Sequence, residues 1–163
     1  MNFQEYLAKS ASIVNKTLES TLTEWVKETG ELHKSLSPLA KLFTERNFGG
    51  KTLRGCLVRL GYELAGGKFT QEIYKASAAF EIFQTAILAH DDIIDLSPTR
   101  RGKPTIYKAL GGDHYGISQT ICLGDLGFFL SQKLIAGSNF DEKLKNKALA
   151  SFADTVLETA LGE

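Results

Sequence analysis

The chain has 163 residues, which is enough for one domain with its own hydrophobic core. Hydrophobic residues make up 43% and charged residues 23% of the sequence, as in an ordinary globular domain. Because 19 Lys and Arg residues balance 19 Asp and Glu residues, the net charge gives no electrostatic case for nucleic acid or an anionic membrane as a partner.

The N-terminal segment lacks the basic stretch and long apolar run of a signal peptide. No apolar run approaches the ~20 residues that a membrane-spanning helix requires, so we expect a cytoplasmic protein without a transmembrane segment. Cys56 and Cys122 have no His or Cys neighbour at metal-ligand spacing. We therefore expect two buried thiols rather than a disulfide or a zinc site.

Helix is the predicted secondary structure throughout the chain. Apolar residues recur at spacings of three and four, only three prolines occur, and no segment alternates as a strand does. Clusters of turn-forming residues mark the breaks, Pro38 interrupts the second helix, and Asp141 is a candidate N-cap for the last. This all-α chain is predicted to have helices at about Phe3–Thr29, Leu32–Thr44, Leu53–Leu64, Gln71–Ile94, Thr105–Leu110, His114–Ala136 and Asp141–Leu161.

A glycine-rich basic loop, "FGGKTLRG", precedes the third predicted helix. Gly49 and Gly50 allow a tight bend and a close approach of the backbone to an anion. Lys51 and Arg54 then lie three residues apart at the start of a helix, where the helix dipole also favours an anion. Such loops also simply cap helices, and the spacing is not that of a P-loop.

An acidic cluster ends the fourth predicted helix. Asp91 and Asp95 are one helical turn apart, and Asp92 is three residues from Asp95. The repulsion between these carboxylates favours a divalent cation such as Mg²⁺, which is commonly held by carboxylates together with phosphate oxygens. A solvated helix end is an equally good interpretation of the three aspartates alone.

The residues before the aspartates favour a ligand that has both an apolar and a charged part. Phe80, Phe83, Gln84, Ile87 and Leu88 lie on or near the helix face of the first aspartate. A solvated acidic helix end would not ordinarily sit directly on an apolar stripe.

A second basic loop follows the acidic cluster. Arg100, Arg101 and Lys103 lie between two prolines, and Arg side chains bind phosphate oxygens in a bidentate manner. A basic loop is more often plain surface. Two basic loops together with an acidic helix end indicate a site for a diphosphate that carries an apolar tail.

The segments "GGKTLRG", "HDDIIDLSPTRRGKPT" and "LGD" (Leu123–Asp125), in this order, resemble the trans-isoprenyl diphosphate synthases, also called polyprenyl synthetases. The resemblance implies an antiparallel helix bundle of the isoprenoid synthase type around a central cavity, usually as a homodimer. It implies a prenyltransferase that couples an allylic prenyl diphosphate head-to-tail with isopentenyl diphosphate and uses Mg²⁺. By position, it assigns Asp91 and Asp95 as Mg²⁺ ligands, Asp92 as their support, and Arg100 as a contact of the allylic diphosphate.

The resemblance also assigns residues to the second substrate. Lys51, Arg54 and Arg101 would hold isopentenyl diphosphate, and Gln84 matches a His or Gln position that also contacts it. These groups suit the reaction, because breaking the allylic C–O bond develops a carbocation and a diphosphate leaving group. Positive charge stabilises the leaving group, and an apolar cavity keeps water from the cation.

The resemblance implies a product of geranylgeranyl length or longer. Ala86 is the fifth residue before Asp91, where members that make short products commonly carry an aromatic residue. Ile87 follows it, and Phe83 and Phe80 lie about 12 and 16 Å from Asp91 along a helix axis, where either could close the cavity floor.

The chain departs from the family pattern in its C-terminal part. Thr52 and Gly55 replace two residues of the family's usual "GGKRLRP" segment, and no adjacent pair of aspartates follows Asp125, so the second aspartate-rich motif is absent. We therefore expect residues 1–163 to be the N-terminal half of one synthase domain, inactive by itself. An alternative is a non-catalytic or regulatory short subunit that pairs with another prenyl synthase chain. A terpene cyclase shares the aspartate chemistry but has no use for both basic loops.

Overall fold

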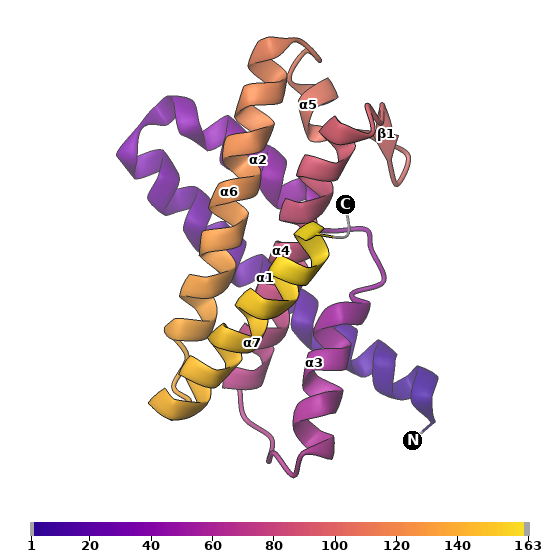
Figure 1. Cartoon of the computed structure of the whole chain (residues 1–163), viewed down its shortest axis with the longest axis vertical. Helices are drawn as coiled ribbons and strands as arrows, with labels where there is room; N and C mark the ends of the chain where they lie inside the picture. The colour runs from indigo at the N-terminus through magenta and orange to yellow at the C-terminus, as the bar shows by residue number, and fades with distance from the viewer. Residues whose placement is uncertain (1, 162–163) are drawn as a thin grey trace.

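The computed structural model describes residues 2–161, which form a bundle of helices with one small hairpin (Figure 1). Two strands of two residues each, β1 (Thr99–Arg100) and β2 (Lys103–Pro104), pair antiparallel. The predicted all-α class is confirmed, and the hairpin is an addition that the sequence did not predict. The helices are α1 (Phe3–Leu32), α2 (Ser37–Arg46), α3 (Leu53–Leu64), α4 (Glu72–Ile94), α5 (Ile106–Ala109), α6 (His114–Ala136) and α7 (Glu142–Leu161), with a 3₁₀ turn η1 at Lys34–Leu36.

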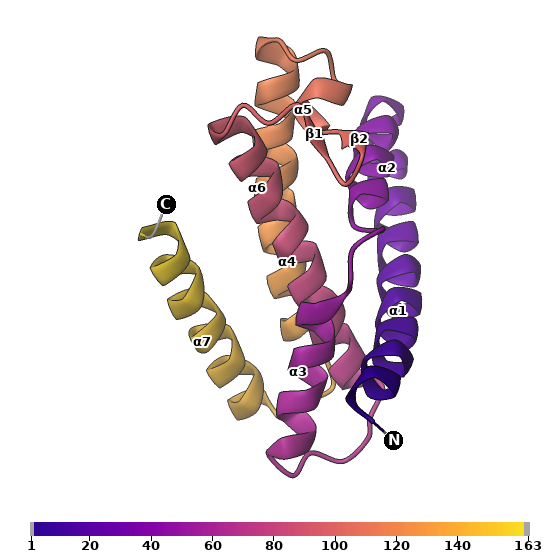
Figure 2. The same ribbon diagram turned by 90° about the vertical axis from the view of Figure 1, so that its right-hand side faces the viewer.

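Helix α4 lies at the centre of the bundle and packs most extensively against the antiparallel α6, then against α3 and α1 (Figure 2). Small residues make the α4–α6 approach possible. A Cβ atom added at Gly127 of α6 would lie 2.8 Å from the Cβ of Ala86 and 2.7 Å from Cζ of Phe43. The second half of α4 is therefore held closely against α6 and α2.

Of three apolar clusters that the described residues form around α4, two bear on the site and lie on different sides of the helix. One joins α4 to α1, α2, α5 and α6 and includes Phe43, Ile82 and Ala86, all essentially inaccessible to solvent. The other joins α4 to α6 and α7 through Phe83 and Phe152. Burial of each phenylalanine or isoleucine side chain in these clusters stabilises the fold by about 1.5–3 kcal/mol. No helix within residues 2–161 is long and apolar enough to cross a membrane.

The predicted helix ends were confirmed at some breaks and wrong at others. Asp141 accepts a hydrogen bond from the backbone N–H of Lys143 at 3.0 Å, as expected of an N-cap. The break expected after Thr29 is wrong, because α1 continues through Gly30; one glycine costs a helix only about 1 kcal/mol. Pro38 lies in the first turn of α2, where proline is tolerated, so the second predicted helix begins there.

The prediction of two buried thiols is half wrong. Both cysteines are free, and Cys56 is buried between α1 and α3, but Cys122 is exposed. Helix α6 packs on α4 through Gly124 and Gly127. Residue 122 lies about 200° around the helix from Gly124, on the outer face.

Candidate active site

The end of α4 carries the acidic cluster, and Arg100 of β1 turns back onto it. Its Nε donates to Oδ1 of Asp92 at 2.8 Å, and its Nη2 donates to Oδ2 of Asp91 at 2.9 Å. The side chain of Asp92 is only 5% exposed, against 25% for Asp91. The hydrogen bond to Asp92, with the charges of both aspartates, raises the pKa of the Arg100 guanidinium, although burial opposes the rise. A partly buried ion pair therefore closes this end of the helix.

Asp95 stands apart from this ion pair. It is the C-cap residue of α4 and is exposed, and its backbone N–H donates to the carbonyl of Asp91 at 2.8 Å. Within residues 2–161, no three His, Cys, Asp or Glu side chains form a metal-binding group. The donor set nevertheless suits Mg²⁺, which proteins bind through one or two carboxylates and substrate phosphates. The sequence did not predict that Asp92 would be the buried member.

The glycine-rich loop joins α2 to α3. Gly49 has φ +87°, which favours glycine, and Thr52 has φ +51° and donates through Oγ1 to Asn15 of α1 at 3.0 Å. Lys51 and Arg54 are both exposed. This loop therefore presents two cations from a backbone that is fixed against α1.

The backbone at the start of α3 already binds a carboxylate of this chain, that of Glu81. The backbone N–H of Gly55 donates to Oε1 of Glu81 at 2.7 Å. A Cβ atom at residue 55 would lie 2.8 Å from Val14 Cγ1 and 2.9 Å from the carbonyl oxygen of Ser77. Glycine therefore fits at residue 55 because α3 approaches α1 and α4 closely there. The helix dipole acts on Glu81 here, and an incoming anion must rely on side-chain cations.

The second basic loop lies on the first. The Arg101 guanidinium covers Gly50, where an added Cβ would be 2.9 Å from its central carbon, and its Nη1 lies 3.4 Å from the carbonyl oxygen of Phe48. The two basic loops and the acidic helix end therefore meet in space.

A cavity of about 150 Å³ opens between these segments. Its lining includes Arg46, Asp92, Arg100, Arg101 and Lys103. Arg46 was missed by sequence reasoning; its only signal is its place at the end of a helix, two residues before the loop.

The residues expected to set product length divide between the two apolar clusters. Phe80 and Phe83 contact Phe152 of α7, with ring centroids 5.3 and 4.6 Å apart, and Ile87 packs against the same cluster. Ala86 instead packs toward α2 and α6. An apolar groove of about 820 Å³ runs between α3, α4 and α7 and is lined in part by Phe80 and Phe152. Gln84 is partly buried and lines neither the cavity nor this groove.

The crossing of α4 and α6 lies directly before the aspartates. Nε2 of His90 is 3.1 Å from a backbone carbonyl of α6 and 3.7 Å from Oδ1 of Asp125. Its ring stacks edge-on against Phe128 at 5.2 Å, and a Cβ at Gly124 would overlap it. The "LGD" segment thus positions the residue next to the acidic cluster.

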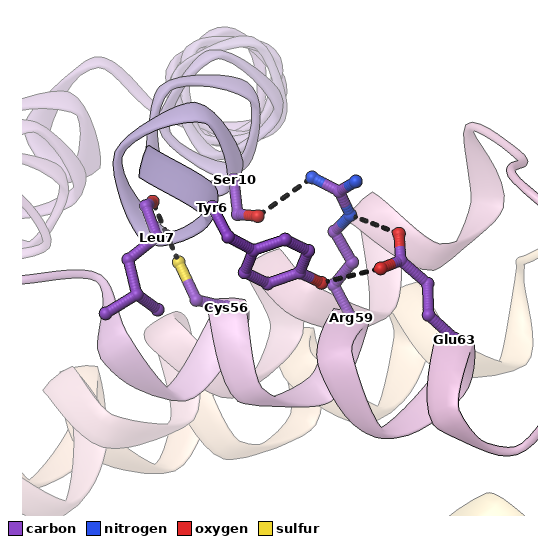
Figure 3. Close-up of polar contacts among 6 residues, drawn as sticks. All are labelled: Tyr6, Leu7, Ser10, Cys56, Arg59 and Glu63. Carbon is purple, nitrogen blue, oxygen red and sulfur yellow. Dashed lines mark hydrogen bonds and ion pairs between the residues drawn. The ribbon is translucent and has the colours of Figure 1, made fainter. Parts of the chain in front are cut away.

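A polar network fastens α3 to the first part of α1 (Figure 3). Arg59 donates to Glu63 and to Oγ of Ser10, both at 2.8 Å, and Tyr6 donates to Glu63 at 2.9 Å. The Cys56 thiol lies 3.7 Å from a backbone carbonyl of α1. Burial, followed by the hydrogen bond to Glu63, raises the pKa of Tyr6. This network fixes α3, whose first turn carries Arg54.

Comparison with known proteins gives one consistent result. The model of the family "Polyprenyl synthetase" matches residues 37–163. A geranylgeranyl diphosphate synthase of Sulfolobus acidocaldarius is 33% identical over 124 residues, which cover 76% of this chain and 33% of that protein. A short chain isoprenyl diphosphate synthase of Methanothermobacter thermautotrophicus is 26% identical over 163 residues, or 46% of its length.

Solved structures agree on the fold. The geranylgeranyl pyrophosphate synthetase of the archaeon Geoglobus acetivorans matches 96% of this chain with a TM-score of 0.80 at 24% identity, over 46% of its own length. The chain thus spans from a third to just under half of the length of these relatives.

Proposed function

Because this chain belongs to the polyprenyl synthetase family, we propose that it supplies the diphosphate-binding part of a prenyltransferase. The reaction is the coupling of an allylic prenyl diphosphate with isopentenyl diphosphate. The observation that carries this proposal is the contact of Arg100 with Asp91 and Asp92, beside Arg101 on the glycine-rich loop. Carboxylates that can bind a metal, next to guanidinium groups that can bind phosphate oxygens, suit a ligand that carries a metal-bound diphosphate.

Four cations divide between the two substrates in this proposal. Arg100 contacts the allylic diphosphate, while Lys51, Arg54 and Arg101 hold isopentenyl diphosphate with the help of Gln84. Their support comes from the geometry of the loops, which present these side chains from a backbone fixed by α1 and α4. Held guanidinium groups orient the two reacting carbons and favour departure of the diphosphate.

Asp91 and Asp95 are the proposed Mg²⁺ ligands, with Asp92 as their support. When bound, Mg²⁺ would neutralise part of the charge on the leaving diphosphate. The buried Asp92 keeps Arg100 beside this position through their ion pair. The carboxylates thus orient a cation of the chain itself as well as the metal.

The aromatic side chains between α4 and α7 form the proposed wall for the growing tail. Phe80, Phe83 and Ile87 exclude water from the carbocation, and the small Ala86 is consistent with a geranylgeranyl or longer product. We propose a homodimer, and we propose that residues 1–163 alone bind diphosphate without turning it over, because they carry only one aspartate cluster.

Calorimetric titration of the chain with farnesyl diphosphate, with and without Mg²⁺, tests this proposal. Asp91→Asn should weaken Mg²⁺-dependent binding about tenfold or more, because a charged ligand to the metal–diphosphate complex is lost. Asp154→Asn, on the exposed surface of α7, removes the same charge elsewhere and should leave the affinity unchanged. Equal affinities for the two variants would contradict the proposed role of Asp91.

A further inference from the structure

The cavity beside Asp92 shares Arg100 and Arg101 with the positions assigned to the substrates, but it lies on a different side of α4 from Asp91 and Gln84. Its α4 lining includes Thr85, Ala89 and Asp92, which share one helix face. Asp91 is rotated from Asp92 by about 100° around the helix. None of Lys51, Arg54 and Gln84 lines the cavity.

Arg46 reaches this cavity from the end of α2. Its side chain is 16% exposed, and its nearest carboxylate is the exposed Glu45 at 3.9 Å. The Nε atom of Arg46 is buried and has no hydrogen-bond partner within residues 2–161. A buried donor without an acceptor is unfavourable, and an anion in the cavity would supply one.

The lining of the cavity has an excess of positive charge. Four cations (Arg46, Arg100, Arg101 and Lys103) line it with two carboxylates. Arg100 is engaged by the aspartates, whereas Arg101 and Lys103 form no ion pair within the described residues. The volume of about 150 Å³ corresponds to about five waters at ~30 Å³ each. This space suits a phosphate group and is too small for a prenyl tail.

We propose that this cavity binds a phosphate or diphosphate group and that Arg46 is one of its contacts. The proposal rests on the proposed function, which brings diphosphates to this end of α4. The group is either the head of isopentenyl diphosphate or free pyrophosphate, the leaving group of the condensation. Arg101 and Lys103 close the cavity from the hairpin, and Arg46 donates from α2.

The test is calorimetric titration of the whole chain, without divalent metal, with inorganic pyrophosphate and separately with isopentenyl diphosphate. Arg46→Gln should weaken pyrophosphate binding by about 10- to 100-fold, because a hydrogen bond to a charged group is lost. Lys41→Gln removes the same charge from the exposed side of α2 and should change affinity less than about twofold. Arg46→Lys keeps the positive charge but loses the planar guanidinium, so its affinity for pyrophosphate should lie between those of the other two variants.

Thermal unfolding without anion separates binding from folding. Arg46→Gln should melt no lower than the native chain, because it removes an unpartnered buried donor and one of four clustered cations.

In the titrations, loss of affinity for both ligands indicates that the diphosphate group itself is held. Loss for one ligand only identifies that ligand as the occupant.

Two results would overturn the proposal: no pyrophosphate binding by the native chain, or equal affinity in Arg46→Gln and Lys41→Gln. If Asp91→Asn weakens metal-dependent farnesyl diphosphate binding but Arg46→Gln leaves pyrophosphate binding unchanged, the proposed anion site is refuted and the proposed function stands. The reverse pattern refutes the proposed function and retains the cavity.

Discussion

Replacing Arg100 by glutamine should destabilise the fold, because Asp92 would remain buried without its cation. Loss of one partner from a fully buried ion pair costs about 3–5 kcal/mol, and an exposed pair contributes about 0–1 kcal/mol. Arg100 lies between these limits, with a side chain 33% exposed against 5% for Asp92. We expect Arg100→Gln to lower the free energy of unfolding by about 2 kcal/mol, which is about 4–8 °C in Tm for a chain of this size.

Urea unfolding followed by circular dichroism measures this change. Arg54→Gln is the matched control, because Arg54 is exposed and forms no ion pair within residues 2–161, and it should change stability by less than about 0.5 kcal/mol. Adding Asp92→Asn to Arg100→Gln should recover part of the loss, with a coupling of about 1 kcal/mol or more in the double-mutant cycle. If Arg100→Gln unfolds like Arg54→Gln, the ion pair does not hold the helix end.

Three further substitutions test the contacts that hold α4 in the bundle. Glu72→Gln should lower stability by about 1 kcal/mol at neutral pH, because the N–H of Asn139 and the charge of Lys75 hold the pKa of Glu72 below its usual 4.5. That stability is present above pH 4.5 and is lost as the pH falls through the lowered pKa, so native and variant urea midpoints should converge in acid. Gly124→Ala should cost about 1–3 kcal/mol in urea unfolding, because the added Cβ overlaps the His90 ring; an unchanged midpoint would contradict the close approach. Ala86→Phe should destabilise the chain by a similar amount in the same assay, because residue 86 is fully buried beside Gly127.

Helix bounds were predictable where clusters of turn-forming residues flank a segment with helical apolar spacing. Helix α3 occupies Leu53–Leu64 and α6 occupies His114–Ala136, as predicted, because glycine-rich turns precede both helices. The single Gly30 was misleading because one glycine costs a helix only about 1 kcal/mol, and α1 continues to Leu32 although Leu32 is largely exposed. The hairpin was missed because two residues per strand leave no alternation to detect.

The composition of the site was predictable, but the roles of individual side chains were not. Which aspartate is buried depends on where the hairpin returns Arg100, and no spacing along α4 contains that information. Glu81 caps α3 from 26 residues away, and Arg46 reaches the cavity only because α2 ends beside α4. Each of these contacts depends on tertiary packing that brings together residues far apart in the chain.

The central claim is that this chain supplies one catalytic half of a prenyl condensation. The most direct test joins it to the remaining length of the Sulfolobus acidocaldarius relative and measures labelled isopentenyl diphosphate incorporation with farnesyl diphosphate and Mg²⁺. We predict geranylgeranyl or longer product from the fusion, none from residues 1–163 alone, and a rate lower by orders of magnitude when Asp91→Ala or Asp95→Ala is introduced. Product from the isolated chain at the rate of the fusion, or a fusion indifferent to Asp91→Ala, would contradict this account.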